Sequence, residues 1–125
     1  MPAHTAFITG AGKNIGRACA LDLAGRGYNV VINGRADKAA CEAVAKEAQA
    51  KGVKAHVVMA DVGLVPEAKR AAKEALAAFG TIDVLVANAA IRPDKPFLDN
   101  TEEDWRCVMG TNLESAIFLS QAFLP

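Results

Sequence analysis

Four short apolar runs recur along the chain, and each is followed by a segment with helical spacing. The runs are mostly continuous and rich in β-branched residues, and they occupy residues 6–9, 30–32, 55–59 and 82–87. Strands that are covered on both faces have continuous apolar runs of this kind, whereas a strand with one face in water alternates apolar and polar residues. The pattern therefore predicts four strands of a parallel sheet.

The segments between the runs carry their apolar residues on one helical face. The clearest segment opposes charged residues to an apolar set made of Ala68, Ala71, Ala72, Ala75, Leu76 and Phe79. Gly80 follows it as a C-terminal cap, and Gly52 closes a similar helix predicted over residues 37–51. Parallel strands need helical crossovers of one hand, so the economical fold is one open α/β sheet with helices on both faces.

The turn after the first strand, TGAGKNIG at residues 9–16, raises the question of phosphate binding. It follows a strand and opens a helix, which is the context that a phosphate-binding turn needs. A Walker loop is excluded, because it would need a glycine at Phe7 and a hydroxyl at Asn14. The glycines at 10, 12 and 16 also miss GxGxxG by one residue, so the turn is either a variant nucleotide-binding turn or a plain strand-to-helix turn.

Three residues of this turn suit the variant. Gly10 permits a sharp exit from the strand, and Asn14 can replace a glycine because asparagine tolerates the left-handed region. We expect Gly16 to face inward, where its missing side chain lets helix and strand pack closely. The inward face is predicted to contain Ile15, Gly16, Cys19, Ala20 and Leu23.

The charge balance narrows the classes of partner. Lys and Arg together number 14, as do Asp and Glu, so no net field attracts nucleic acid or an anionic membrane. The three widely spaced cysteines favour reduced thiols, and the two histidines lack a metal-ligand spacing. The start of the chain lacks a signal-peptide pattern, and no apolar run approaches the length of a membrane span. We expect a soluble cytoplasmic protein without a metal.

Four motifs, in order along the chain, resemble the short-chain dehydrogenase/reductase family. The first turn of this family reads TGxxxGxG, and here Thr9, Gly10 and Gly16 match while Asn14 replaces the middle glycine. The resemblance covers essentially all of the chain. It implies a Rossmann-type, doubly wound parallel sheet in three α/β/α layers.

The later motifs lie at the ends of the third and fourth predicted strands. Asp61 and Val62 stand where the family places an Asp and an apolar residue against the adenine ring. In the stretch VANAAI, Asn88 and Ala89 match the second and third residues of the family's NNAG. Ala87 and Ala90 differ from its first and last residues. The resemblance thus implies a cofactor site made of Gly10, Lys13, Asn14, Ile15, Gly16, Arg35, Asp61, Val62, Asn88 and Ala89.

Residues 101–124 resemble the family's long fourth helix, with Asn112 at the position of its catalytic asparagine. In the family this residue distorts the helix and holds a water in a proton relay. The spacing of the helix places Asn112 on one stripe with Trp105 and Leu119, where burial is expected and an amide needs partners. A structural core asparagine is the alternative.

Asp61 and Asn88 also have structural alternatives. Asp61 can tighten the loop before the helix at Pro66, and Asn88 can form a turn at a strand end.

The end of the second strand indicates the type of cofactor. It carries Arg35 in place of the acid that holds the ribose hydroxyls of NAD, and a guanidinium can pair with a 2′-phosphate. Lys13 adds a second cation at a position that is often basic in NADP-preferring relatives. These two residues favour NADP(H) over NAD(H), and the missing acid weakens a methyl-donor-binding alternative.

The chain lacks the family's Tyr-x-x-x-Lys pair, since its one tyrosine is Tyr28 and Ile32 lies four residues later. We therefore expect residues 1–125 to be a dinucleotide-binding domain truncated after the fourth helix, whose full-length protein reduces a carbonyl or oxidises an alcohol. A non-catalytic NADP(H)-binding module is the alternative. If the fourth strand is the last, the fourth helix exposes much of its apolar stripe, which in this family contributes to a dimer interface, so the resemblance implies a homo-oligomer through this helix.

Overall fold

The computed structural model describes residues 3–124 and is built around a sheet of four parallel strands. They are β1 (Thr5–Ile8), β2 (Asn29–Gly34), β3 (Ala55–Met59) and β4 (Val84–Val86), and their order in the sheet is β3-β2-β1-β4. In the register, Phe7 of β1 lies opposite Val31 of β2 and Leu85 of β4. The predicted parallel sheet is confirmed.

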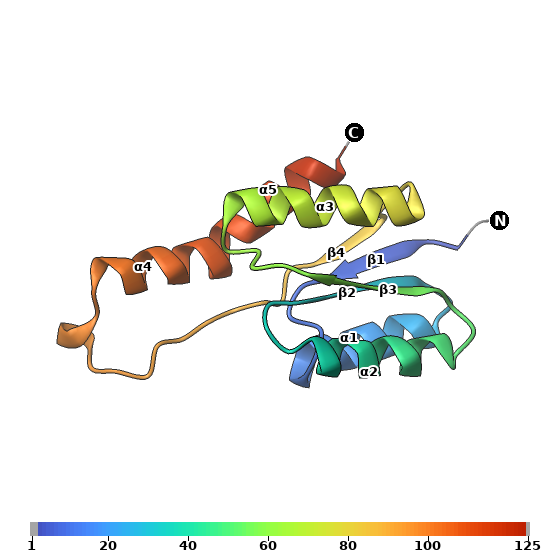
Figure 1. Ribbon diagram of the computed structural model, residues 1–125, viewed down its shortest axis with the longest axis horizontal. Coiled ribbons are helices and arrows are strands. Elements are labelled where there is room, and N and C mark those ends of the chain that lie inside the picture. The colour runs from blue at the N-terminus through green and yellow to red at the C-terminus, as the bar shows by residue number, and fades with distance from the viewer. Residues whose placement is uncertain (1–2, 125) are drawn as a thin grey trace.

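Helices cover both faces of this sheet (Figure 1). On one face lie α1 (Asn14–Gly25) and α2 (Lys38–Gln49), and on the other lie α3 (Val65–Phe79) and α5 (Ser115–Phe123). Successive residues of a strand point to opposite faces, so Ile8 packs into the α1–α2 core and Phe7 into the α3–α5 core. This arrangement confirms the predicted three-layer α/β/α fold.

Two helix ends are capped, and the cap at Gly80 was predicted. Asp37 precedes α2, and its Oδ1 accepts a hydrogen bond from the backbone N–H of Ala40 at 3.0 Å. Gly80 ends α3 with a φ of 81°, a conformation that glycine adopts without strain.

The fourth strand is shorter than predicted. Only Val84–Val86 is assigned to β4, because these residues pair with Ala6, Phe7 and Ile8 of β1. The apolar character of the flanking residues reflects burial near the sheet rather than pairing within it, since Ile82 is buried in the α3–α5 core.

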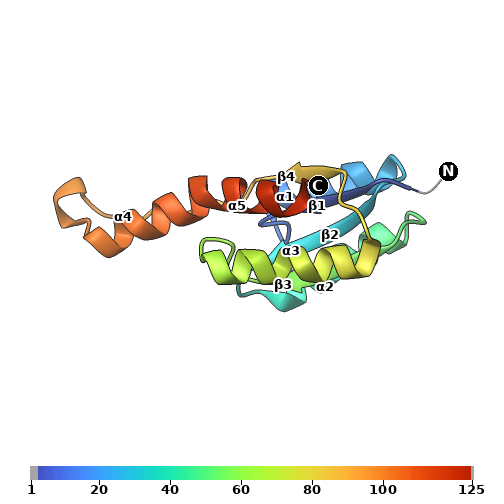
Figure 2. The ribbon, with the colours of Figure 1, turned by 90° about the horizontal axis from the view of Figure 1, so that it is seen from above.

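The predicted fourth helix is not continuous. A short 3-10 turn, η1 (Phe97–Asp99), precedes α4 (Glu102–Met109), and a π-helical segment, η2 (Gly110–Glu114), joins α4 to α5. Figures 1 and 2 show α4 projecting away from the sheet, while α5 packs beside α3. None of the helices in residues 3–124 is long and apolar enough to cross a membrane.

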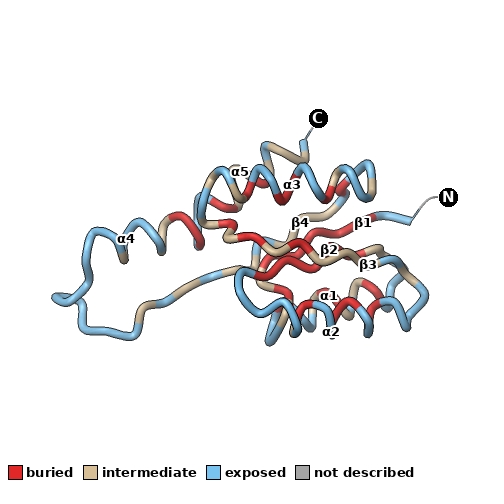
Figure 3. Tube along the Cα trace, in the orientation of Figure 1, coloured by how far each residue is buried: buried red, intermediate tan, exposed pale blue. Residues whose placement is uncertain are grey.

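Because α4 projects, the part of the apolar stripe that lies on α4 is exposed. Trp105 is 64% exposed, whereas Leu119 on α5 is fully buried. Figure 3 shows the same contrast, with exposed residues along most of α4 and buried ones in the sheet. The stripe is continuous in sequence, but only its C-terminal half has a layer to pack against.

Candidate functional site

A cleft opens beyond the carboxyl ends of the strands, next to β1. The strand order reverses at β1, because β2 and β3 lie on one side of it and β4 lies on the other. Ligands of open α/β sheets bind at such a point. The cleft has a volume of about 480 Å³ and is lined by segments that follow all four strands. All of the predicted cofactor residues except Gly16 line it: Gly10, Lys13, Asn14, Ile15, Arg35, Asp61, Val62, Asn88 and Ala89.

The glycine-rich turn bends through two residues with left-handed backbone. Gly10 has a φ of 61° and Asn14 a φ of 52°, the conformation that the sequence predicted Asn14 to tolerate. Gly16 is buried, and the position needs a glycine because a side chain there would overlap the carbonyl oxygen of Gly10. Backbone thus packs on backbone where the turn enters α1.

The start of α1 leaves donors free at the cleft. Lys13 precedes the helix, and its side chain makes no capping hydrogen bond to the first turn. The first N–H groups of a helix lack partners within the helix, so they can bind an anion. The turn therefore fits a phosphate group.

Ile15 does not lie on the inward face of α1, and that prediction was wrong. The buried residues of the helix are Gly16, Ala20 and Ala24, which follow one another at four-residue spacing. Ile15 is turned about 100° from Gly16 around the axis. Its side chain is 71% exposed and lines the cleft instead.

Thr9 and Asn88 join the first turn to the end of β4. The hydroxyl of Thr9 accepts hydrogen bonds from the backbone N–H groups of Asn88 at 2.9 Å and Ala89 at 2.8 Å. In return, Nδ2 of Asn88 donates to the carbonyl oxygens of Thr9 and Gly10 at 3.2 Å each. Asn88 thus supports the turn. Thr9 belongs to the motif of the first turn, but the motif does not indicate these contacts.

Asp61 both tightens its loop and lines the cleft. Its Oδ1 accepts a hydrogen bond from the backbone N–H of Gly63 at 3.0 Å. Its own N–H donates to Oε1 of Glu67, in the first turn of α3, at 2.9 Å. Val62 beside it is buried and lines the same cleft. The structural alternative for Asp61 is therefore compatible with a role at the site.

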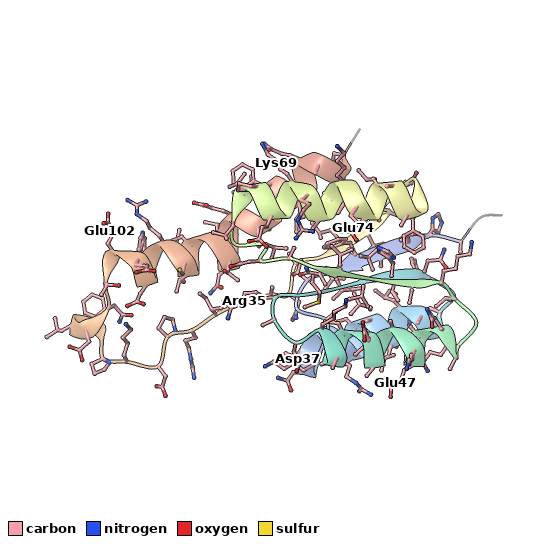
Figure 4. All side chains as sticks on the ribbon, viewed as in Figure 1. Arg35, Asp37, Glu47, Lys69, Glu74 and Glu102 are labelled. Atoms are coloured by element: carbon pink, nitrogen blue, oxygen red, sulfur yellow. The ribbon has the colours of Figure 1, made fainter. Side chains whose placement is uncertain are left out.

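Two cations lie at the rim of the cleft. Arg35 follows β2, as Figure 4 shows, and Lys13 precedes α1; both are exposed. Neither takes part in any ion pair found among residues 3–124. Asp37 also lines the cleft, but its carboxylate caps α2. Both cations can therefore pair with an anionic ligand.

Cys41 also lines the cleft, although no sequence motif indicated it. It is buried, and its thiol packs so closely against Gly34 that a side chain at that position would overlap the sulfur. Burial, with smaller contributions from Asp37 and Glu42, raises the pKa of the Cys41 thiol above its ordinary value. The thiol therefore stays neutral at physiological pH, and the unusual glycine at the end of β2 is the signal for it.

Asn112 lies in the π-helical segment and faces the loop after β4. Its Oδ1 accepts a hydrogen bond from the N–H of Ile91 at 2.8 Å, and its Nδ2 donates to the carbonyl of Ile91 at 2.9 Å. The residue is exposed, so the expectation of burial was wrong: the backbone of Ile91 satisfies its amide on the open side of the helix. Asn112 does not line the cleft, whereas its neighbours Thr111 and Ile91 do.

The segment around Asn112 has the helical distortion that the family resemblance implies. Single π-helical turns occur often at functional sites. The tyrosine of the chain, Tyr28, precedes β2 and so lies at the opposite edge of the sheet from the cleft.

This architecture defines a class of protein, the open parallel α/β sheets that bind nucleotides at a point of strand-order reversal. Comparison with known proteins narrows the class. The family described as short chain dehydrogenase matches residues 4–125, and the chain belongs to this family.

Individual relatives agree with this assignment. The chain is 40% identical over 121 residues to the 3-oxoacyl-[acyl-carrier-protein] reductase FabG of Staphylococcus epidermidis, covering 97% of this chain and 50% of that protein. The chain spans about half the length of the curated relatives it matches.

Solved structures show the same fold. A blue fluorescent protein from a metagenomic library, in complex with NADPH, matches 96% of this chain and 49% of its own, with a TM-score of 0.91 and 30% identity. A short chain dehydrogenase from Burkholderia cenocepacia, in complex with NADP, matches 95% of this chain and 49% of its own, with a TM-score of 0.91 and 31% identity.

Proposed function

We propose that this chain is the cofactor-binding part of an NADP(H)-dependent oxidoreductase that transfers hydride between nicotinamide and a carbonyl or alcohol substrate. The observation that carries the proposal is the pair of cations, Lys13 and Arg35, at the rim of a cleft where the strand order reverses. The complexes of the two solved relatives with NADPH and NADP support the choice of cofactor.

The residues of the cleft fit a dinucleotide. The free N–H groups of α1 would hold the pyrophosphate, and the close packing of Gly16 on Gly10 keeps the start of this helix beside the turn. Arg35 and Lys13 would pair with the 2′-phosphate, and Asp61 and Val62 would contact adenine.

The bound nicotinamide would supply or accept the hydride. The chain's own contribution near that end is positional: Asn112 holds the loop at Ile91, and Asn88 holds the turn. A proton donor for the alkoxide, the family's Tyr-x-x-x-Lys pair, is proposed to lie in the half of the relatives' length that this chain does not span.

Exchanging the charge of Arg35 tests the cofactor assignment. We expect Arg35→Asp to weaken NADPH binding roughly 10- to 100-fold, because an ion pair becomes a repulsion, and to change NADH binding much less. Fluorescence titration of both cofactors measures this. Arg106→Asp, on the projecting α4, is the matched control. An equal loss for NADPH and NADH would show that Arg35 does not bind the phosphate.

A second candidate function is an NADP(H)-binding module without turnover. It is favoured by the position of Tyr28 at the opposite edge of the sheet from the cleft, which leaves this chain no phenol at the site. The test is made on the protein at the length found in the cell: binding of NADPH without its oxidation, over a panel of carbonyl compounds, would support this candidate, and turnover would exclude it.

A further inference from the structure

Asn33, near the end of β2, has an amide whose orientation is determined by its neighbours. The residue is only 1% exposed, and its Nδ2 donates to the carbonyl oxygens of Val58 at 3.0 Å and Ala60 at 3.3 Å. Both partners are acceptors, so the nitrogen must face them and the oxygen must point elsewhere.

The oxygen of this amide has no donor in the protein. Among the hydrogen bonds of residues 3–124, none ends on Oδ1 of Asn33, although its backbone carbonyl accepts from Ala11. No side-chain polar atom in that part of the chain is both fully enclosed and unpartnered. Oδ1 therefore reaches open space, and the open space beside Asn33 is the cleft that it lines. A buried carbonyl of this kind needs a donor.

The surroundings indicate which donor fits. Asn33 is held against Ala60, which leads directly into Asp61 and Val62, and all four residues line the cleft. The carboxylate of Asp61 is a second acceptor there. A ligand that meets both groups must bring hydrogen-bond donors, and an exocyclic amino group supplies two N–H donors from one atom.

We infer that Asn33 reads the base of the cofactor: its Oδ1 accepts a hydrogen bond from the 6-amino group of adenine and selects an amino over an oxo base. The inference rests on the proposed function, since it needs a dinucleotide in this cleft. A 6-oxo base would place a carbonyl oxygen against Oδ1, so two acceptors would face each other without a proton.

Cofactor analogues test this inference by binding alone. Purified protein would be titrated by fluorescence with NADPH and with its hypoxanthine analogue, which carries the 6-oxo base. We expect the wild type to bind the analogue about tenfold more weakly, the effect of one lost hydrogen bond with an acceptor left unpaired. Asn33→Ala should weaken NADPH binding and remove most of this preference.

Two further variants separate base reading from support of β3. Ser115→Ala removes another buried polar group, whose hydroxyl bonds the carbonyl of Thr111, and should leave the preference unchanged. Asn33→Ser keeps a small polar side chain if the alanine variant does not fold, and should also lose the preference.

The outcomes distinguish this inference from the proposed function. Absence of NADPH binding by the wild type would overturn the proposed function. Tight NADPH binding with equal affinity for the analogue would overturn the inference alone. Equal loss of both ligands in the folded Asn33 variants would also overturn it, because it would reduce Asn33 to a support of β3.

Discussion

Gly16 lies where the first turn of α1 meets the carbonyl oxygen of Gly10, and a side chain there would also approach Nδ2 of Asn88 to 2.7 Å. One missing methyl group thus lets three segments meet at the edge of the cleft. Asn14 is needed for its backbone, because its left-handed φ of 52° is a conformation that few side-chain-bearing residues accept.

Substitution of Gly16 by alanine tests how far the fold and the cleft depend on this close packing. We expect Gly16→Ala to lower the free energy of unfolding by roughly 1–3 kcal/mol and to abolish cofactor binding, since backbone atoms must move to admit the methyl group. Gly25→Ala in the same helix is the control, because nothing lies within 4 Å of its new Cβ. That variant should be neutral or slightly stabilised. Urea unfolding and NADPH titration measure both, and an unperturbed Gly16→Ala protein would contradict the argument.

At the scale of elements, the π-helical segment η2 connects two parts of the site. Gly110 packs directly on Gly63, since an added Cβ would lie 2.5 Å from the carbonyl oxygen of Gly63. On the same segment, Asn112 holds Ile91 by two hydrogen bonds. The loop after β3 and the loop after β4 are thus braced by one short irregular stretch of helix.

Removing the amide of Asn112 should release the loop after β4. We expect Asn112→Ala to increase the hydrogen-exchange rate of the Ile91 amide by about tenfold or more, because its acceptor is lost. Asn112→Asp keeps an acceptor for this N–H and should retain most of the protection. In Asn100→Ala, the control, only contacts within the 3-10 turn are lost. Unchanged exchange in the alanine variant would show that Asn112 does not hold the loop.

At the scale of the whole molecule, the projecting arm of η1 and α4 leaves apolar side chains in water. Phe97 is 86% exposed and Trp105 64%, and Ile117 on α5 is 46% exposed. Large apolar side chains left in water on successive elements favour an interaction site. We propose that a second copy of the chain covers it.

Light scattering tests this proposal. We expect a dimer or larger oligomer for the wild type, and a shift toward monomer for Trp105→Glu, because a charge would be buried in the contact. Lys51→Glu, beyond the end of α2 and far from this surface, should not shift the mass. A wild-type monomer at high concentration would contradict the proposal.

Much of the fold could be predicted because its signals are local. Continuous apolar runs identified the strands, the helical stripe and Gly80 identified α3, and the glycine turn located the start of α1. The motifs also identified the family. That the cleft residues bind NADP(H) stays a prediction, although the fold brings nearly all of them to one place.

The amino-acid sequence by itself determined the layers, the order of the elements and the chemistry of the turn, since hydrophobic period and backbone preference act over a few residues. The tertiary structure decided what each side chain meets. It exposed Ile15 and Asn112, buried Cys41, and enclosed Asn33 at the wall of the cleft. These outcomes depend on residues far apart in the chain, which parallel strand order brings to one edge of the sheet, and no local pattern encodes such contacts.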